Sequence, residues 1–282
     1  DRARNFANMY TGADPEAPNW DHDKLIIRSP INGSRGPHFK YTWDDWSTCR
    51  WDLAQYQVPF DDLDVPTEMR EFRGEIVPIA DWKEDRVYEV ILEALNERQM
   101  HGDVPLNLAA TSLVTNAYIY TGEESYRKWV LDYLEAWGER IEANGGLCPY
   151  NVGHSDVGHS GAIGETLDGK WFGGYYGWSW PHGFMNIIES LNIAAMNAVL
   201  MTGDMSYLEI PRGQMRRMLD LGRVEDGRLL MPHRYSDRGW TGYSPVEPGF
   251  LVPLWYVSQD EKDLKLIEAL PDCSTHWPAL DA

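Results

Sequence analysis

The stretch that decides the fold is Asn116-Ala117-Tyr118-Ile119-Tyr120-Thr121-Gly122-Glu123-Glu124-Ser125-Tyr126. It returns as Asn197-Ala198-Val199-Leu200-Met201-Thr202-Gly203-Asp204-Met205-Ser206-Tyr207, with the same residue at about six of eleven positions. In each copy an apolar segment ends at Thr-Gly, where glycine adopts the left-handed conformation that closes a helix, and an acidic residue opens the next helix. Each copy therefore predicts an antiparallel helical hairpin, which must stack on neighbouring hairpins to bury its second face.

Helical periodicity surrounds these two turns. Val87, Val90, Ile91 and Leu95 share one face of a helix that begins near Lys83. Further helices are expected over residues 106–120, 124–142, 184–201, 205–222, 248–258 and 261–269. Residues 1–82 are rich in Pro, Gly, Asp and Trp and predict an irregular arm with a short helix near residues 43–55. We therefore expect two parts: this N-terminal arm and a helical-hairpin domain over residues 83–282.

The Thr-Gly-acidic-x-x-Tyr turns resemble those of the (α/α) toroid, or six-hairpin, enzymes, between about Lys83 and Leu270. That class contains glycoside hydrolases, unsaturated-uronyl hydrolases, sugar epimerases and many polysaccharide lyases. The resemblance implies an all-α dominated fold, a (α/α) helical-hairpin toroid or partial toroid with an irregular N-terminal arm. We count about seven helices after Lys83, against about twelve in a closed ring, so either an open arc or a piece of a longer protein is expected. The end at Leu280-Asp281-Ala282, without a cap signal, favours the second.

Composition points to carbohydrate and away from polyanions. The chain holds 13 Trp and 15 Tyr beside only 7 Phe, and indole and phenol rings stack on the flat C–H faces of sugars. The formal charge of -19 repels phosphate backbones and anionic membrane surfaces, so neither nucleic acid nor a membrane is an expected partner. A polysaccharide or oligosaccharide substrate predicts a secreted or periplasmic protein. The first residues, Asp1-Arg2-Ala3-Arg4, carry no apolar signal core, so we expect that any export signal has been removed or never existed.

Three long connections are expected to build the functional site. They span residues 101–107, 144–183 and 224–248, and all three lie at the end of the hairpins opposite the Thr-Gly turns. Long irregular connections held by rigid helices commonly carry functional residues. We therefore predict that the three connections converge on one cavity, centred on the aromatic and histidine-rich segment from Asn151 to His182.

The residues of this segment suit a lyase that cleaves a uronic-acid-containing glycan by β-elimination. Such a reaction needs a group that neutralises the uronate carboxylate, a base and an acid. The resemblance implies Asn or Arg as neutraliser with His and Tyr as base and acid. We expect these roles at Asn151, at His154 or His159, and at Tyr175 or Tyr176. Residues expected to bind the substrate are Asn107, Trp171, Trp178, Trp180, His182, His233, Arg234 and Tyr243.

Two other functions stay open. A glycoside hydrolase needs two carboxyl groups flanking the scissile bond, and the candidates are Asp103, Asp156, Glu165, Asp168 and Glu189. The acidic composition suits a neutral glycan better than a polyanion. An enzyme that binds a polyanion would need cations at its site, and the candidates in these connections are Lys170, Arg234 and Arg238. Acidic residues are abundant everywhere, whereas clustered His and Tyr are not, and this favours the lyase. A non-catalytic glycan-binding protein is the third possibility.

No cofactor and no metal are predicted. The spacing of His154, Asp156 and His159 offers imidazole and carboxylate ligands, but no helix fixes them and no HExxH motif is present. Phosphate-binding loops, dinucleotide fingerprints and nucleophile elbows are also missing from the sequence.

Overall fold

A computed structural model describes residues 1–28, 33–38, 64–72, 75–81, 83–98, 102–149, 151–152, 166–167, 170–171, 183–236 and 239–270. Its helices are α1 (Arg2–Thr11), α3 (Asp85–Arg98), α4 (Thr111–Thr121), α5 (Glu124–Ala143), α6 (Phe184–Thr202), α7 (Glu209–Asp220), α8 (Val252–Ser258) and α9 (Glu261–Ala269). Short 3-10 turns at Pro105–Ala110, Met205–Leu208 and Pro248–Phe250 lead into α4, α7 and α8. The helices expected after Lys83 are thus confirmed, while the one expected near residues 43–55 lies outside the described residues.

The two Thr-Gly turns have the same hydrogen bonds. Gly122 and Gly203 close α4 and α6 at φ of 69° and 75°, a region that favours glycine. The Thr202 hydroxyl donates to the Ala198 carbonyl at 2.7 Å and accepts from the Asp204 amide at 3.1 Å. Thr121 makes the equivalent bonds to Ala117 and Glu123. The threonine therefore satisfies groups that both helix ends would otherwise leave unpaired.

A third turn of this kind joins α8 to α9. Gln259 has a φ of 54° in place of the glycine, and the Asp260 amide donates to the Ser258 hydroxyl at 3.0 Å. Ser and Gln stand where the other two turns have Thr and Gly, so the sequence repeat does not show this copy. Within the described residues the helices therefore form three helical hairpins, α4–α5, α6–α7 and α8–α9.

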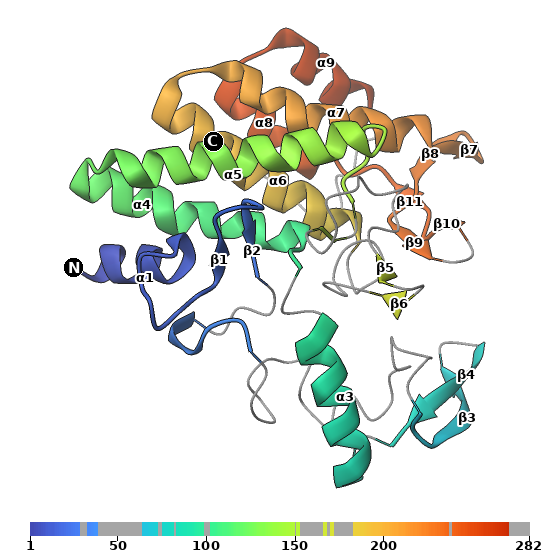
Figure 1. Cartoon of the computed structure of the whole chain (residues 1–282). Helices are drawn as coiled ribbons and strands as arrows, with labels where there is room; N and C mark the ends of the chain where they lie inside the picture. Colours follow the sequence, from blue (N-terminus) through green and yellow to red (C-terminus); the bar gives the residue numbers. More distant parts are fainter. Residues whose placement is uncertain are drawn as a thin grey trace.

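The hairpins stack in two layers (Figure 1). Helices α4, α6 and α8 pack side by side, and α5, α7 and α9 return beside them. This arrangement confirms the predicted fold class: an all-α dominated, partial (α/α) toroid with a largely irregular N-terminal segment. The strands β7 to β11 of the last long connection lie at the end of the layers opposite the turn between α4 and α5 (Figure 1).

Helix α6 lies at the centre of the stack. It packs on α4, α5, α7 and α8, and its buried side chains include Phe184, Ile187, Leu191 and Ala195. Among the described helices, α6 alone has the length and hydropathy of a membrane span. Its burial among four other helices accounts for that composition, because a core helix is apolar on nearly every side.

The N-terminal segment packs on the helical layers at two places. Helix α1 lies along α4, and the Tyr126 hydroxyl of α5 donates to Asn8 Oδ1 at 2.7 Å. The small hairpin of β1 (Trp20–Asp21) and β2 (Ile26–Ile27) sets the Trp20 ring against Trp129, with centroids 4.9 Å apart. A second hairpin, β3 (Thr67–Phe72) and β4 (Glu75–Ala80), lies with α3 apart from these layers in Figure 1.

The last long connection is built of short antiparallel strands. Its three-stranded sheet has the order β11 (Ser244–Pro245), β8 (Arg228–Met231), β7 (Arg223–Glu225), and β9 (Arg234–Ser236) pairs with β10 (Gly239–Thr241). Asp226 and Gly227 form the two-residue turn between β7 and β8, both at positive φ. Asp-Gly is a strong hairpin signal, so the turn between β7 and β8 has a local signature in the sequence.

Candidate functional site

The first and second long connections meet at Asp103. The Asp103 amide donates to the Val152 carbonyl at 2.7 Å, and the Val152 amide donates back to the Asp103 carbonyl at 3.0 Å. This isolated antiparallel bridge fixes where the second connection leaves the hairpin α4–α5. Asn151, next to it, is therefore carried to the same place.

The Asp103 carboxylate gathers four donors. Oδ2 accepts from the Ile27 amide at 2.9 Å and from the Tyr133 hydroxyl at 2.8 Å. Oδ1 accepts from the Val104 amide at 2.7 Å and from Asn107 Nδ2 at 2.8 Å. Burial raises the pKa of Asp103 to about 6, against these hydrogen bonds and the charge of Arg140, which lower it. With no exposed surface and both oxygens occupied, this carboxylate holds the connection in place and does not meet a substrate.

The second and third connections meet at the start of α6. The Phe184 amide donates to the His233 carbonyl at 2.8 Å, and the two rings pack edge to face with centroids 6.1 Å apart. His233 Nε2 lies 2.8 Å from the Ser244 hydroxyl. Burial lowers the pKa of His233, with Arg234 adding to this effect and Glu247 opposing it, so the ring is neutral at neutral pH. All three long connections are thus tied together at one end of the hairpins.

One carboxylate stands on α6 at this end. Glu189 is the sole ionisable residue of the helix and is exposed, five residues after Phe184. Along the same face follow Ile193, Met196 and Leu200, at helical spacing, toward the Thr-Gly turn. The end of this face near the long connections is therefore charged, and the rest is apolar.

Besides His233, the structure describes four of the expected site residues in or beside these connections. Asn151 is only 1% exposed, which leaves no accessible amide to neutralise a substrate carboxylate. Asn107 is half-buried and occupied with Asp103. Arg234 is half-buried on β9, and the guanidinium of Arg223 lies 3.8 Å above the Tyr243 ring. One face of that ring is therefore covered and does not stack on a sugar.

The other expected site residues, except Trp171, lie outside the residues that the structure describes. His154, His159, Tyr175, Tyr176, Trp178, Trp180 and His182 lie outside the described residues, as do Asp156, Glu165 and Asp168. Trp171 is described only as part of β6 (Lys170–Trp171), which pairs with β5 (Thr166–Leu167). Within the described part of the chain, no group of three His, Cys, Asp or Glu side chains is arranged to hold a metal ion.

Ser244 and Trp240 of this site were not singled out from the sequence. Ser244 hydrogen bonds to His233 across the third connection, and the Trp240 ring packs edge to face on Tyr235, a residue that the sequence did offer for the lyase, with centroids 4.9 Å apart. Tyr235 and Trp240 are directly paired in the register of β9 and β10. The strand pattern that brings them together begins at the Asp226-Gly227 turn, which marks this connection as a series of hairpins.

Comparison with known proteins gives three results. A family model described as "Domain of unknown function (DUF8034)" matches residues 1–228. No curated protein matches by sequence. Among solved structures, the glycoside hydrolase family 76 mannosidase Bt3792 from Bacteroides thetaiotaomicron VPI-5482 matches with 17% identity and a TM-score of 0.34, over 67% of this chain and 53% of that chain. The chain thus spans about half the length of that structure.

Proposed function

The chain belongs to the DUF8034 family, a domain of unknown function, and we propose that it is a carbohydrate-active enzyme that hydrolyses a neutral glycan. The observation that carries this proposal is that the long connections are joined pairwise, the first to the second at Asp103 and Val152 and the end of the second to the third at Phe184 and His233. Rigid helices hold both contacts, and catalytic groups are best positioned on such rigid elements.

Glu189 supplies one carboxyl group of the proposed reaction. It is the single ionisable side chain of the central helix, it is exposed five residues after Phe184, and it forms no ion pair with any residue in the described part of the chain. Hydrolysis of a glycosidic bond needs a carboxylic acid that protonates the leaving oxygen and a second carboxylate that activates water or attacks the sugar carbon. The second group would come from the middle connection, where Asp156, Glu165 and Asp168 remain the candidates.

The charge balance supports a neutral glycan. A formal charge of -19 repels a polyuronate, and the burial of Asn151 removes the group expected to neutralise a uronate carboxylate. The geometry of the described residues therefore favours the hydrolase over the lyase that the sequence suggested first.

The β-elimination lyase stays the second candidate because of the histidines and tyrosines in the middle connection. His154, His159, Tyr175 and Tyr176 still offer a base and an acid for it. Either enzyme would act on a polymer too large to enter a cell, so we propose a secreted or periplasmic location.

One assay separates the two candidates. The purified chain is incubated with neutral polysaccharides, such as mannan, xylan and β-glucan, and with polygalacturonate and alginate. New reducing ends without near-ultraviolet absorbance, on a neutral glycan, are expected. An unsaturated product that absorbs in the near ultraviolet, formed from a uronate, would replace the hydrolase with the lyase. Tight binding of a glycan with no product of either kind would identify a non-catalytic binding protein.

A further inference from the structure

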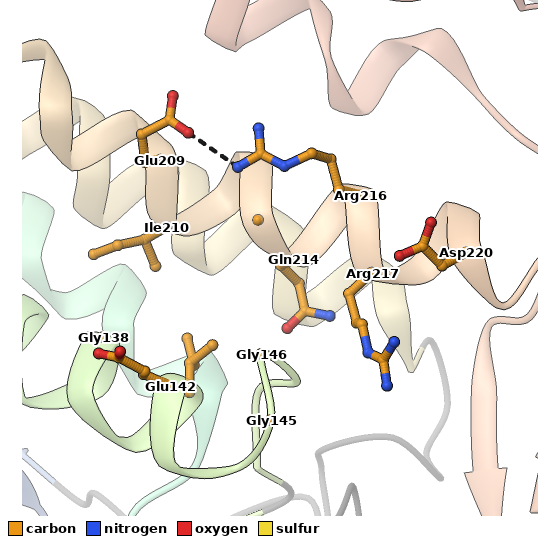
Figure 2. A pocket seen from close by; sticks show the side chains of 12 residues that line it. Gly138, Glu142, Gly145, Gly146, Glu209, Ile210, Gln214, Arg216, Arg217 and Asp220 are labelled. Carbon is orange, nitrogen blue, oxygen red and sulfur yellow. Dashed lines mark hydrogen bonds and ion pairs between the residues drawn. The ribbon is translucent and has the colours of Figure 1, made fainter.

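A pocket lies on the outer flank of the helical layers, between α5 and α7, away from the contacts between the long connections. Its volume is about 590 Å³, within the range of small-molecule sites. Figure 2 shows the end of α5 and the loop at Gly145 and Gly146 on one side, and α7 on the other. Both helices pack on α6, and Gly138 of α5 approaches Ile210 of α7 so closely that an added Cβ would lie 3.3 Å from its Cδ1 atom.

The glycines leave space that the fold does not use. Gly213 lies within α7, where glycine lowers helix stability relative to alanine. An added Cβ at Gly213 would meet nothing within 4 Å, and the same holds for Gly145 and Gly146. Packing therefore does not explain the glycine at position 213, whereas an occupant of the pocket would.

Polar groups around this space lack partners. Gln214 is fully buried, and its Oε1 accepts from the Cys148 amide at 2.6 Å, while its Nε2 has no hydrogen-bond partner among the residues that the structure describes. An unpaired buried donor is costly, so stability alone does not explain this part of α7. Arg217, Glu142 and Asp220 also line the pocket and form no ion pair with any residue whose position the structure describes.

The mixture of donors and acceptors selects the ligand class. Arg217 and Gln214 Nε2 only donate hydrogen bonds, whereas the carboxylates of Glu142 and Asp220 only accept them. An anion would be repelled by the two carboxylates, and a cation would leave the donors unused. Hydroxyl groups both donate and accept, and Ile141 and Ile210 offer apolar surface to the C–H groups of a sugar ring.

We propose that this pocket binds a neutral sugar unit, at a site separate from the one at which cleavage is proposed. Arg217 donates to ring hydroxyls, Glu142 and Asp220 accept from them, the buried Gln214 lies beneath the ring, and Gly213 leaves room for it. The Gln214–Cys148 bond links the pocket to the start of the middle connection, which continues to Asn151 and the Asp103 bridge. The binding does not depend on catalysis and is measured without turnover.

The test is methyl NMR on the whole chain labelled at isoleucine δ1 carbons. Mannobiose, cellobiose and maltose are the neutral probes, and digalacturonate is the anionic one. At least one neutral disaccharide should shift the Ile141 and Ile210 methyl resonances, while that of Ile119, exposed on α4 at the short-turn end, stays in place. No shift at either position with any neutral probe would overturn the proposal, and so would larger shifts with digalacturonate.

Two substitutions locate the site. Gly213→Phe fills the pocket and should weaken the neutral probe at least tenfold, and Gly213→Ala, which adds a single methyl group to the same wall, should weaken it by a smaller factor. Arg217→Ala should weaken it about fivefold, and the exposed Arg228→Ala, outside the pocket, serves as its matched control. Unchanged affinity in both Gly213→Phe and Arg217→Ala would place the sugar elsewhere and contradict the proposal. An inactive chain that still shows the Ile210 shift would overturn the proposed hydrolase and leave this pocket standing.

Discussion

The Tyr133 hydroxyl, in the middle of α5, donates a 2.8 Å hydrogen bond to Oδ2 of Asp103, which lies before α4. Through this bond the hairpin α4–α5 holds its own preceding connection. Because the Asp103 carboxylate also binds the Ile27 amide and the Asp103 backbone pairs with Val152, this one residue joins the N-terminal hairpin, α5 and the first two long connections. The position of the proposed site depends on this group.

Replacing Asp103 with Asn should therefore destabilise the protein. Each Asp103 oxygen accepts two hydrogen bonds, so the NH2 group of Asn would place a donor against two other donors. These are either Ile27 and Tyr133 or Val104 and Asn107. We expect a loss of about 2–4 kcal/mol in the free energy of unfolding, measured with urea. Tyr133→Phe removes a single donor and should cost about 1 kcal/mol. A variant Asp103→Asn as stable as the wild type would show that these bonds do not hold the connection.

The same carboxylate gives a pH dependence of defined sign. Burial raises the pKa of Asp103 to about 6, so the folded state holds the proton more tightly than the unfolded chain does. Protonation therefore favours folding: the contribution is complete below about pH 4 and is lost as the pH rises through about 6, a change of about 3 kcal/mol. The stability difference between wild type and Asp103→Asn should widen as the pH falls from 7 to 4. A difference that stays constant or narrows would refute the assignment.

Replacing the glycine of a hairpin turn with alanine should destabilise the protein, whereas the same change within α7 should not. Gly203→Ala forces alanine to a φ of 75° and should lower the free energy of unfolding by about 1 kcal/mol. Gly213→Ala, at an ordinary helical position, should raise it by up to about 1 kcal/mol. Thermal or urea unfolding of the two variants checks the prediction, which fails if their order is reversed.

The ion pair between α7 and α9 should contribute more to the free energy of unfolding than the ion pairs at the surface. Arg212 donates from Nε to Asp263 Oδ1 at 3.0 Å and from a second nitrogen to Oδ2, and the two side chains are only 11% and 8% exposed. Asp263→Ala removes the partner that binds Arg212 through two hydrogen bonds and leaves it with Glu209 at 2.9 Å, so it should cost about 2 kcal/mol in urea unfolding. Glu261→Ala breaks the exposed pair with Lys265 and should change stability by less than about 1 kcal/mol. Equal effects would contradict this ranking.

The helices could be predicted from the sequence because their signals are local. Apolar spacing and the Thr-Gly turns mark α4 to α7 closely, since helix ends depend on neighbouring residues. The third hairpin turn, between the helices expected over residues 248–258 and 261–269, does not appear in the sequence repeat because Gln259 adopts the left-handed conformation without glycine. The strands of the last connection were not predicted, because each has only two to four residues and too short an apolar pattern. The Asp226-Gly227 turn is the one local signal for them.

The site was less predictable, because its contacts join residues far apart in the chain. The order of the long connections already indicated that they converge. Nothing local indicated that Asp103 would receive donors from Ile27 and Tyr133, or that Asn151 would be buried beside it. Ser244 pairs with His233 only because the strands between them fold back.

The exposed Glu189 carboxylate on α6 offers the most direct test of the proposed hydrolase. Glu189→Gln keeps the shape of the side chain and removes its acid and base chemistry, and Glu93→Gln, exposed on α3, is the matched control. The measurement is the rate at which reducing ends appear from the best neutral glycan. We predict that Glu189→Gln lowers this rate at least about a hundredfold while Glu93→Gln retains it. Full activity in Glu189→Gln would contradict the account.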